Sequence, residues 1–228
     1  MKKNLLIVGA SRGIGAAVAE FYDANGDNVI SVSRTPSKIG EWVGADISTP
    51  GGIKKVIKAA SVLSLDALLF MGGVWEKGAF TEDYDFEKSS HTETQSIIDV
   101  NLIAPIEITK GLLENLRKAE NPRAIFMGAT SGLEVSNTLE VAYSASKFGL
   151  RGAVHALRLG FEKEGIGFTV INPGYVGTKE VLEDIRSGQS PNLVPIPMAD
   201  VILAVDFVLR SSRSTDVGDI TLTQKFVS

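Results

Sequence analysis

Two side chains suited to proton transfer lie four residues apart in the segment Tyr143-Ser144-Ala145-Ser146-Lys147. The segment opens a strong helical pattern, so this spacing places the phenol of Tyr143 and the ammonium of Lys147 on one face of a helix. A free tyrosine titrates at about pH 10, and an adjacent ammonium favours the phenolate and lowers the pKa. Such a pair is usually structural, and it becomes a candidate acid and base where a reactive partner binds beside it.

A glycine-rich turn, Gly9-Ala10-Ser11-Arg12-Gly13-Ile14-Gly15, could bind such a partner. It follows an apolar run and opens a helical pattern, so small residues let the backbone approach a pyrophosphate at the helix N-terminus. The spacing is G-x-x-x-G-x-G rather than G-x-G-x-x-G, and a tight strand–helix connection is the alternative interpretation. We interpret the turn as a dinucleotide-binding site.

The end of the second apolar run indicates which dinucleotide binds. It reads Ser31-Val32-Ser33-Arg34-Thr35, without the carboxylate that holds the ribose hydroxyls in NAD sites. Arg34 and Arg12 could instead grip a 2′-phosphate, which a guanidinium suits well. The sequence therefore predicts NADP(H) rather than NAD(H), the alternative being that each arginine is merely solvated.

The elements that must position these residues alternate between short apolar strands and longer helices. We expect strands at Leu5–Val8, Val29–Val32, Ala67–Met71, Ala124–Met127, Phe168–Ile171 and Ile220–Leu222, with a weaker one at Trp42–Ala45. Helical patterns cover Ile14–Ala24, Ile53–Val62, Gln95–Lys118, Ala142–Glu164 and Ala199–Leu209. Continuous apolar strands with helical crossovers predict an α/β fold: a Rossmann-like, doubly wound, seven-stranded parallel sheet with helices on both faces. We expect one dinucleotide-binding and catalytic domain over residues 1–228.

Two long segments interrupt the alternation, Val74–Thr94 and residues 174–197. Ligands of open α/β sheets bind at the carboxyl ends of the strands, so both segments are candidate walls of a site. We predict that residues 174–197 form a lid over substrate and cofactor. Trp75 could line the substrate cleft, although an aromatic side chain in a loop more often packs over the core.

Composition excludes several other functions. The net charge is −4 and the basic residues are scattered, which argues against nucleic-acid binding. The apolar stretch near the N-terminus is too short for a signal segment or a membrane span, so we expect a cytoplasmic protein. There is no cysteine, and His91 and His155 have no further ligand placed near them, so no metal site is expected.

Taken together, these motifs resemble those of the short-chain dehydrogenase/reductase family, of the single-domain NADP(H)-dependent type. The match spans essentially the whole chain. It rests on Gly9, Gly13 and Gly15, on Asp46-Ile47 after the third strand, on Asn101 in Val100-Asn101-Leu102, on Tyr143 and Lys147, and on Pro173-Gly174-Tyr175-Val176-Gly177-Thr178. Where the family usually has Asn-Asn-Ala-Gly, this chain has Phe70-Met71-Gly72-Gly73, which keeps the close backbone approach but loses a side-chain hydrogen bond.

A second departure concerns the family's catalytic serine. Counting back from Tyr143 by the usual spacing reaches Thr130, whereas registering the strand from Arg123 and Gly132 reaches Ala129. Ser131 lies two residues beyond Ala129 and could face the same side by strand alternation. We favour Ser131 as the hydroxyl donor, with Thr130 as the alternative.

The resemblance implies a mechanism and an assembly. NADPH would deliver hydride to a carbonyl carbon while Tyr143 protonates the oxygen and Ser131 or Thr130 donates a hydrogen bond to it. Lys147 would lower the tyrosine pKa and hold the nicotinamide ribose, and Asn101 would anchor a water. The substrate would be a small or medium ketone, aldehyde or secondary alcohol, and the protein a homodimer or homotetramer. The alternative is an NADP(H)-binding regulatory or scaffold protein with little turnover.

Overall fold

The computed structural model describes residues 2–134, 136–188 and 193–225, and within them seven strands form one parallel sheet. Their spatial order is β3-β2-β1-β4-β5-β6-β7, so the chain winds outward from β1 in both directions. This is the Rossmann-like doubly wound sheet that the alternating pattern predicts. The strands are β1 (Asn4–Val8), β2 (Asn28–Ser33), β3 (Glu41–Gly44), β4 (Ala67–Phe70), β5 (Arg123–Met127), β6 (Gly167–Pro173) and β7 (Asp219–Leu222).

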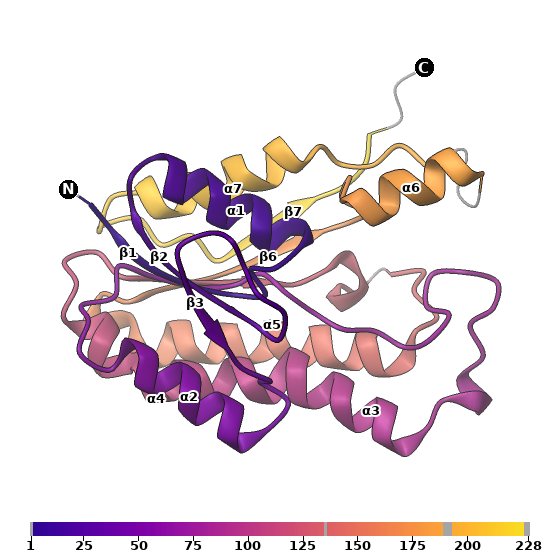
Figure 1. The fold of residues 1–228 in the computed structure, drawn as a ribbon, viewed down its shortest axis with the longest axis horizontal. Coiled ribbons are helices and arrows are strands. Elements are labelled where there is room, and N and C mark those ends of the chain that lie inside the picture. Colours follow the sequence, from indigo (N-terminus) through magenta and orange to yellow (C-terminus); the bar gives the residue numbers. More distant parts are fainter. Residues whose placement is uncertain (1, 135, 189–192, 226–228) are drawn as a thin grey trace.

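Helices cover both faces of the sheet (Figure 1). One face carries α1 (Gly13–Ala24) and α7 (Met198–Arg210), and the other carries α2 (Pro50–Ala60), α4 (Ala104–Arg117) and α5 (Val141–Phe161). None of the helices in the described ranges has the length and apolar character needed to span a bilayer.

The five inner strands supply both cores in turn, as the continuous apolar runs predict. In β1, Leu6 and Val8 pack with the residues of α2, α4 and α5, while Leu5 and Ile7 pack with those of α1 and α7. All four side chains are at most 3% exposed. The carboxyl ends of the strands therefore meet at one rigid edge, where the glycine turn and the end of β5 lie.

The helix predicted from Gln95 begins earlier and is not regular throughout. α3 (His91–Ile98) starts after Ser90, whose hydroxyl accepts a hydrogen bond from the backbone N–H of Glu93 at 3.1 Å. A π-helical turn, Asp99–Ile103, then joins α3 to α4. The first turn of α3 is polar, so the apolar periodicity that predicts helices does not include it. A π turn has no characteristic composition and cannot be predicted from the sequence in this way.

Residues 174–197, predicted to be irregular, contain a helix. α6 (Lys179–Ser187) is capped by Thr178, whose hydroxyl accepts from Val181 N at 3.4 Å, and ends at Gly188, with φ +81°. Its residues are mostly exposed, and its apolar stripe consists only of Val181, Leu182 and Ile185, which is too short to stand out in the sequence. Residues 189–192 of the predicted lid lie outside the described residues.

Candidate active site

The glycine turn joins β1 to α1 and packs against the residue that follows β4. A Cβ on Gly9 would meet backbone atoms of Gly72 at 2.6 Å, and one on Gly15 would meet the carbonyl oxygen of Gly9 at 2.2 Å. Gly9 also has φ +87°, in the region that favours glycine. Tight packing alone thus requires these glycines, so a ligand has to be inferred from another feature.

That feature is the open N-terminus of α1. Arg12 occupies the N-cap position without a capping side-chain hydrogen bond, and the first turn contains no acidic residue. The orphan N–H groups and the helix dipole of Gly13 and Ile14 are thereby left for an anion, with Ser11 in the same turn. These residues fit the pyrophosphate of a dinucleotide.

A cavity of about 890 Å³ lies at the ends of β2 and β3. Arg34, Lys55 and Lys58 bring three cationic side chains to its lining, and Asp46 brings one carboxylate. The other lining residues are Trp42, Val43, Gly44, Ala45 and Ala59. Hydrogen bonds from Ser48 and, more weakly, the charge of Arg34 lower the pKa of Asp46, so the carboxylate is ionised. An excess of positive charge therefore faces the cavity, which suits a phosphate.

Sequence reasoning predicted only some of the residues that line this cavity. Lys55 and Lys58 were missed, because lysines on a helix ordinarily indicate no more than a solvated face. Arg12, expected to join Arg34 at a phosphate, does not line the cavity and instead pairs with Glu180 of α6 at 3.4 Å. Ser33 donates to the carbonyl oxygen of Thr35 at 2.6 Å and shapes the turn after β2. Ile47 packs partly buried against the core.

Tyr143 and Lys147 lie on the first turns of α5, as predicted. The ammonium of Lys147 is buried, donates to the carbonyl oxygen of Met127 at the end of β5 at 2.8 Å, and lies 5.5 Å from the ring centroid of Tyr143. A Cβ on Gly73 would lie 3.2 Å from Lys147 Nζ and 3.4 Å from Asn101 Oδ1. The fold thus brings Tyr143, Lys147, Gly73 and Asn101 together at the carboxyl edge of the sheet.

Both polar atoms of the Asn101 side chain, in the π turn, make hydrogen bonds within the protein. Its Nδ2 donates to Val74 O at 2.7 Å and to Ser146 Oγ at 3.0 Å, and its Oδ1 accepts from Val74 N at 2.9 Å. Ser146 in turn donates to the carbonyl oxygen of Tyr143 at 2.7 Å. The side chain therefore locks the segment after β4 to α5, which leaves the backbone and the second lone pair of Oδ1 for a water at this residue.

The candidate hydroxyls lie in the 3-10 turn Thr130–Gly132, directly after β5. Ser131 is 5% exposed and Thr130 half-buried, and Ala129 precedes them in extended conformation. Ser131 Oγ lies 2.6 Å from Thr138 Oγ1, which accepts from Ser136 Oγ at 2.8 Å. If Thr138 donates its own hydrogen to Ser131, the Ser131 O–H is free to donate to a substrate oxygen.

The segment after β6 lies beside the glycine turn. Gly174 N, after Pro173, donates to Leu222 O at 2.8 Å, and Val176 pairs with Ile196 in an isolated bridge. A Cβ on Gly13 would lie 3.7 Å from the methyl group of Thr178, at the start of α6. The N-termini of α1 and α6 therefore converge on the same region.

Residues 3–189 match the family described as short chain dehydrogenase. The chain belongs to the short-chain dehydrogenase family. It is therefore an oxidoreductase of the type that acts on CH–OH or C=O groups with a nicotinamide cofactor.

Among its relatives, the oxidoreductase UcpA of Escherichia coli (strain K12) is 27% identical, over 96% of this chain and 85% of its own length. The structure of 4-hydroxyisoleucine dehydrogenase complexed with NADH is similar at a TM-score of 0.81 and 23% identity, covering 97% of both chains. ElxO with NADP bound is similar at 0.82 and 20% identity, covering 98% of both. The two structures show the same fold with different dinucleotides, so cofactor choice has to be argued from this chain's own residues.

The electrostatics of this short-chain dehydrogenase differ from the expectation for its tyrosine. Burial, and then the negative charges of Glu140 and Glu76, raise the pKa of Tyr143 above 10.0. Burial also lowers the pKa of Lys147 to about 8. In the free protein, Lys147 therefore does not bring the pKa of Tyr143 below its ordinary value as predicted, because burial raises this pKa most, two carboxylates add to the effect, and the ammonium donates to Met127 O.

Those two glutamates are further site residues that sequence reasoning missed. Glu76 is 3% exposed, and its Oε1 accepts from the backbone N–H groups of Ala142 and Tyr143 at 2.7 and 3.2 Å. Glu140 is 4% exposed and accepts from Phe80 N at 2.6 Å. Both clamp the long loop after β4 onto the start of α5. Neither glutamate could be recognised as a site residue from the sequence, because acidic residues in polar segments are ordinarily solvated.

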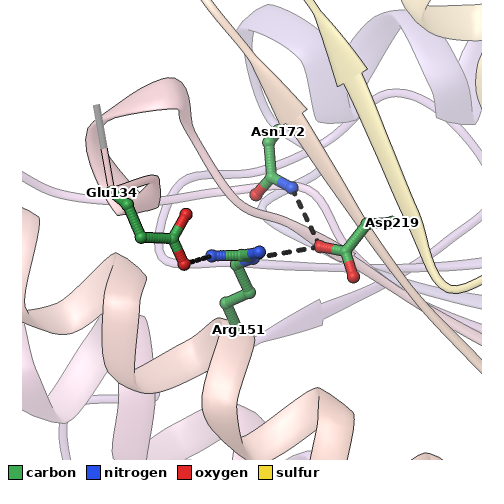
Figure 2. A network of polar contacts seen from close by, with 4 residues as sticks. All are labelled: Glu134, Arg151, Asn172 and Asp219. Carbon is green, nitrogen blue, oxygen red and sulfur yellow. Dashed lines mark hydrogen bonds and ion pairs between the residues drawn. The ribbon is translucent and has the colours of Figure 1, made fainter. Parts of the chain in front are cut away.

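A polar network holds α5 against the sheet on the side of the candidate hydroxyls. Figure 2 shows Arg151, one turn beyond Lys147, between Glu134 at 2.8 Å and Asp219 of β7 at 3.2 Å. Asn172 of β6 donates to the same Asp219 oxygen at 3.3 Å. The network links α5, β6, β7 and the segment after Ser131, so their relative positions are fixed from outside the site.

Proposed function

We propose that this short-chain dehydrogenase is an NADP(H)-dependent carbonyl reductase and alcohol dehydrogenase acting on a small or medium ketone, aldehyde or secondary alcohol. The observation that carries the proposal is the placement of Tyr143 beside Lys147, 5.5 Å from its ring, with Asn101 and Gly73 at the same edge of the sheet, and the raised pKa of Tyr143 agrees with it. A phenol that keeps its proton at neutral pH is the form that a general acid needs during carbonyl reduction.

The cofactor, when bound, supplies or accepts the hydride. Gly9, Ser11 and the open N-terminus of α1 would hold its pyrophosphate, and Asp46 and Ile47 would lie beside its adenine. Gly72, Gly73, Pro173, Gly174, Val176 and Thr178 would line the rest of its site.

Arg34, with Lys55 and Lys58 on the same cavity, supports a 2′-phosphate and hence NADP(H). A guanidinium binds phosphate through paired donors, and the two ammonium groups add charge. One carboxylate, Asp46, opposes three cations.

Each side chain of the site would have a separate role in the reaction. Tyr143 gives its proton to the carbonyl oxygen, and Ser131, or alternatively Thr130, donates a hydrogen bond to the oxygen as negative charge develops on it. Lys147 holds the nicotinamide ribose, and Asn101 keeps the loop after β4 on α5. The segment 174–197 closes over substrate and cofactor and excludes water.

We further propose a single domain, working in the cytoplasm as a homodimer or homotetramer. Apolar side chains on the outer faces of the helix regions 99–118 and 141–161 support assembly, since Ile103, Phe148 and Leu159 are 41%, 42% and 67% exposed. Sedimentation at micromolar concentration tests this, and a monomer would contradict it.

The second candidate is an NADP(H)-binding regulatory protein with little turnover. The observation that favours it is Ala129, buried at the end of β5 where one register places the family's serine. The intact group of Tyr143, Lys147 and Asn101 argues against it, because binding alone needs no proton donor.

A panel of ketones, aldehydes and secondary alcohols, followed at the NADPH absorbance band, separates the two candidates. We expect turnover, and we expect Tyr143→Phe to reduce it by about 10²–10⁴-fold while NADPH still binds. Tight NADPH binding without turnover across the panel would instead support the regulatory candidate, above all if Ala129→Ser then produced activity.

A further inference from the structure

Two buried carboxylates beside Tyr143 have no cationic partner among the residues that the structure describes. None of the ion pairs within the described ranges involves Glu76 or Glu140. Lys147 lies on the same helix turn as Tyr143 but donates to Met127 O instead. Burying a carboxylate without a counter-ion is costly, so the pair calls for an explanation.

Helix capping accounts for only one of the two carboxylate oxygens of Glu76. Its Oε1 accepts from two N–H groups at the N-terminus of α5, where the helix dipole stabilises negative charge. Its Oε2 is buried and has no hydrogen-bond partner among the described residues. That oxygen sits on the same carboxyl carbon and therefore lies beside the backbone of Tyr143. Buried acceptors are rarely left unpaired in proteins, so Oε2 calls for a donor that this part of the chain does not supply.

Aromatic rings contact the ring of Tyr143 on the same part of the molecule. Phe80 contacts Tyr143 at a centroid distance of 5.4 Å and Tyr175 at 6.0 Å, and Trp75 contacts Tyr143 at 6.4 Å, all edge to face. Trp75, Phe80 and Tyr175 remain 48%, 37% and 42% exposed. The Phe80 backbone has φ +65°, a strained value for a bulky residue, and Glu140 holds its N–H. Ring surface therefore stays open to a ligand next to two negative charges.

We propose that the substrate carries an ammonium group near its reacting carbon, so that this enzyme acts on amino ketones, amino aldehydes or amino alcohols. The ammonium donates to Glu76 Oε2, is balanced by the charges of Glu76 and Glu140, and packs on the ring faces of Trp75, Phe80 or Tyr175. A carboxylate combined with aromatic faces is the arrangement that recognises organic cations. The inference rests on the proposed reductase function, because it names the substrate class of that site.

The test compares amino ketones with hydroxy ketones of equal chain length, starting with aminoacetone and hydroxyacetone and lengthening the spacer by up to two carbons. With NADPH and the wild-type protein, we expect kcat/KM for the best amino ketone to exceed that of its hydroxy partner at least tenfold. A ratio near or below one for every spacer would overturn the proposal, and this comparison needs no variant.

Glu76→Gln then separates recognition from capping. The amide oxygen still accepts from Ala142 N and Tyr143 N, but the negative charge is lost. We expect the amino-to-hydroxy ratio to fall toward one, whatever the change in the absolute rates. Glu93→Gln is the matched control, because Glu93 also accepts a backbone N–H, from Lys77 at 2.8 Å, at the surface. An unchanged ratio in folded Glu76→Gln would assign this glutamate to capping alone and refute its role.

A binding measurement distinguishes failure of the inference from failure of the proposed function. If neither series is reduced, the reductase proposal fails, and the wild-type protein with NADPH is titrated with 1-aminopropan-2-ol and propane-1,2-diol while tryptophan fluorescence is followed. Tighter binding of the amino alcohol, weakened by Glu76→Gln, would still support a cation site. Equal or absent binding of the two would overturn it.

Discussion

Replacing Lys147 by methionine should make the protein more stable while abolishing its chemistry. Lys147 is 3% exposed, and the one hydrogen bond of its ammonium within the described residues goes to the carbonyl oxygen of Met127. Methionine has a similar length and no charge, so it can occupy the same apolar space. The expected gain follows from the pKa of the lysine.

Burial lowers the pKa of Lys147 from 10.5 to about 8, so the folded state holds the charged form at a cost. At about 1.4 kcal/mol for each tenfold change in acidity, the cost at pH 7 is roughly 3 kcal/mol. Removing the ammonium also leaves Met127 O without its donor, which costs about 1 kcal/mol. Lys147→Met should therefore raise the free energy of unfolding by about 2 kcal/mol at pH 7.

The pH dependence of the stability difference tests whether the buried charge of Lys147 is its cause. Between the folded pKa of about 8 and the unfolded value of 10.5, the unfolded wild-type chain binds more protons at Lys147, so wild-type stability rises with pH. The advantage of the variant should shrink by about 2 kcal/mol by pH 9.5. Urea unfolding followed by circular dichroism at one protein concentration measures both values. Tyr143→Phe, which keeps the ammonium, serves as the control.

A variant less stable than wild type at pH 7 would refute the reasoning. An advantage that is equal at both pH values would show that the gain comes from packing rather than from the buried charge.

Three further predictions concern the chemistry. Arg34→Asp should weaken NADPH binding by more than about a hundredfold and leave NADH binding nearly unchanged, since it replaces a paired phosphate contact by repulsion; equal losses in titrations of both cofactors would exclude a role in cofactor choice. Ser131→Ala should lower kcat for ketone reduction by about two orders of magnitude while Thr130→Val changes it little, and the reverse result would transfer the role to the threonine. Because the pKa of Tyr143 is raised, alcohol oxidation should increase with pH from about 7 to 9, as the phenolate base forms, while ketone reduction stays nearly constant; parallel profiles in the two directions would contradict this.

The sheet could be predicted from the sequence because its inner strands are buried on both faces. Runs such as Leu5–Val8 are apolar at every position, and a parallel sheet covered by helices is the arrangement that needs this. The same reasoning missed α6, whose residues face mainly solvent and whose apolar stripe is limited to Val181, Leu182 and Ile185 between the caps at Thr178 and Gly188. Elements held by packing were predictable, and elements held by caps were not.

The residues of the site likewise divide into those that a local sequence pattern predicts and those that only the fold brings together. The glycine turn and the four-residue spacing of Tyr143 and Lys147 are local patterns, and the structure brings them to the same edge of the sheet as expected. Burial raises the pKa of Tyr143 most, the charges of Glu140 and Glu76 add to this, and Glu76 is remote in the sequence. A local pattern therefore located the phenol but gave the wrong direction for its pKa, because that direction depends on which side chains the fold buries beside it.

The direction of this shift connects proton transfer to substrate charge. The carboxylates of Glu140 and Glu76 disfavour the phenolate of Tyr143 in the free protein. An ammonium bound at Glu76 Oε2 would offset one of these charges, so the pKa of Tyr143 would fall when a cationic substrate binds. A neutral substrate would leave the carboxylates unopposed and the phenol a weaker acid. The same glutamate would thus favour an amino ketone twice, first in binding and then in the proton transfer that follows.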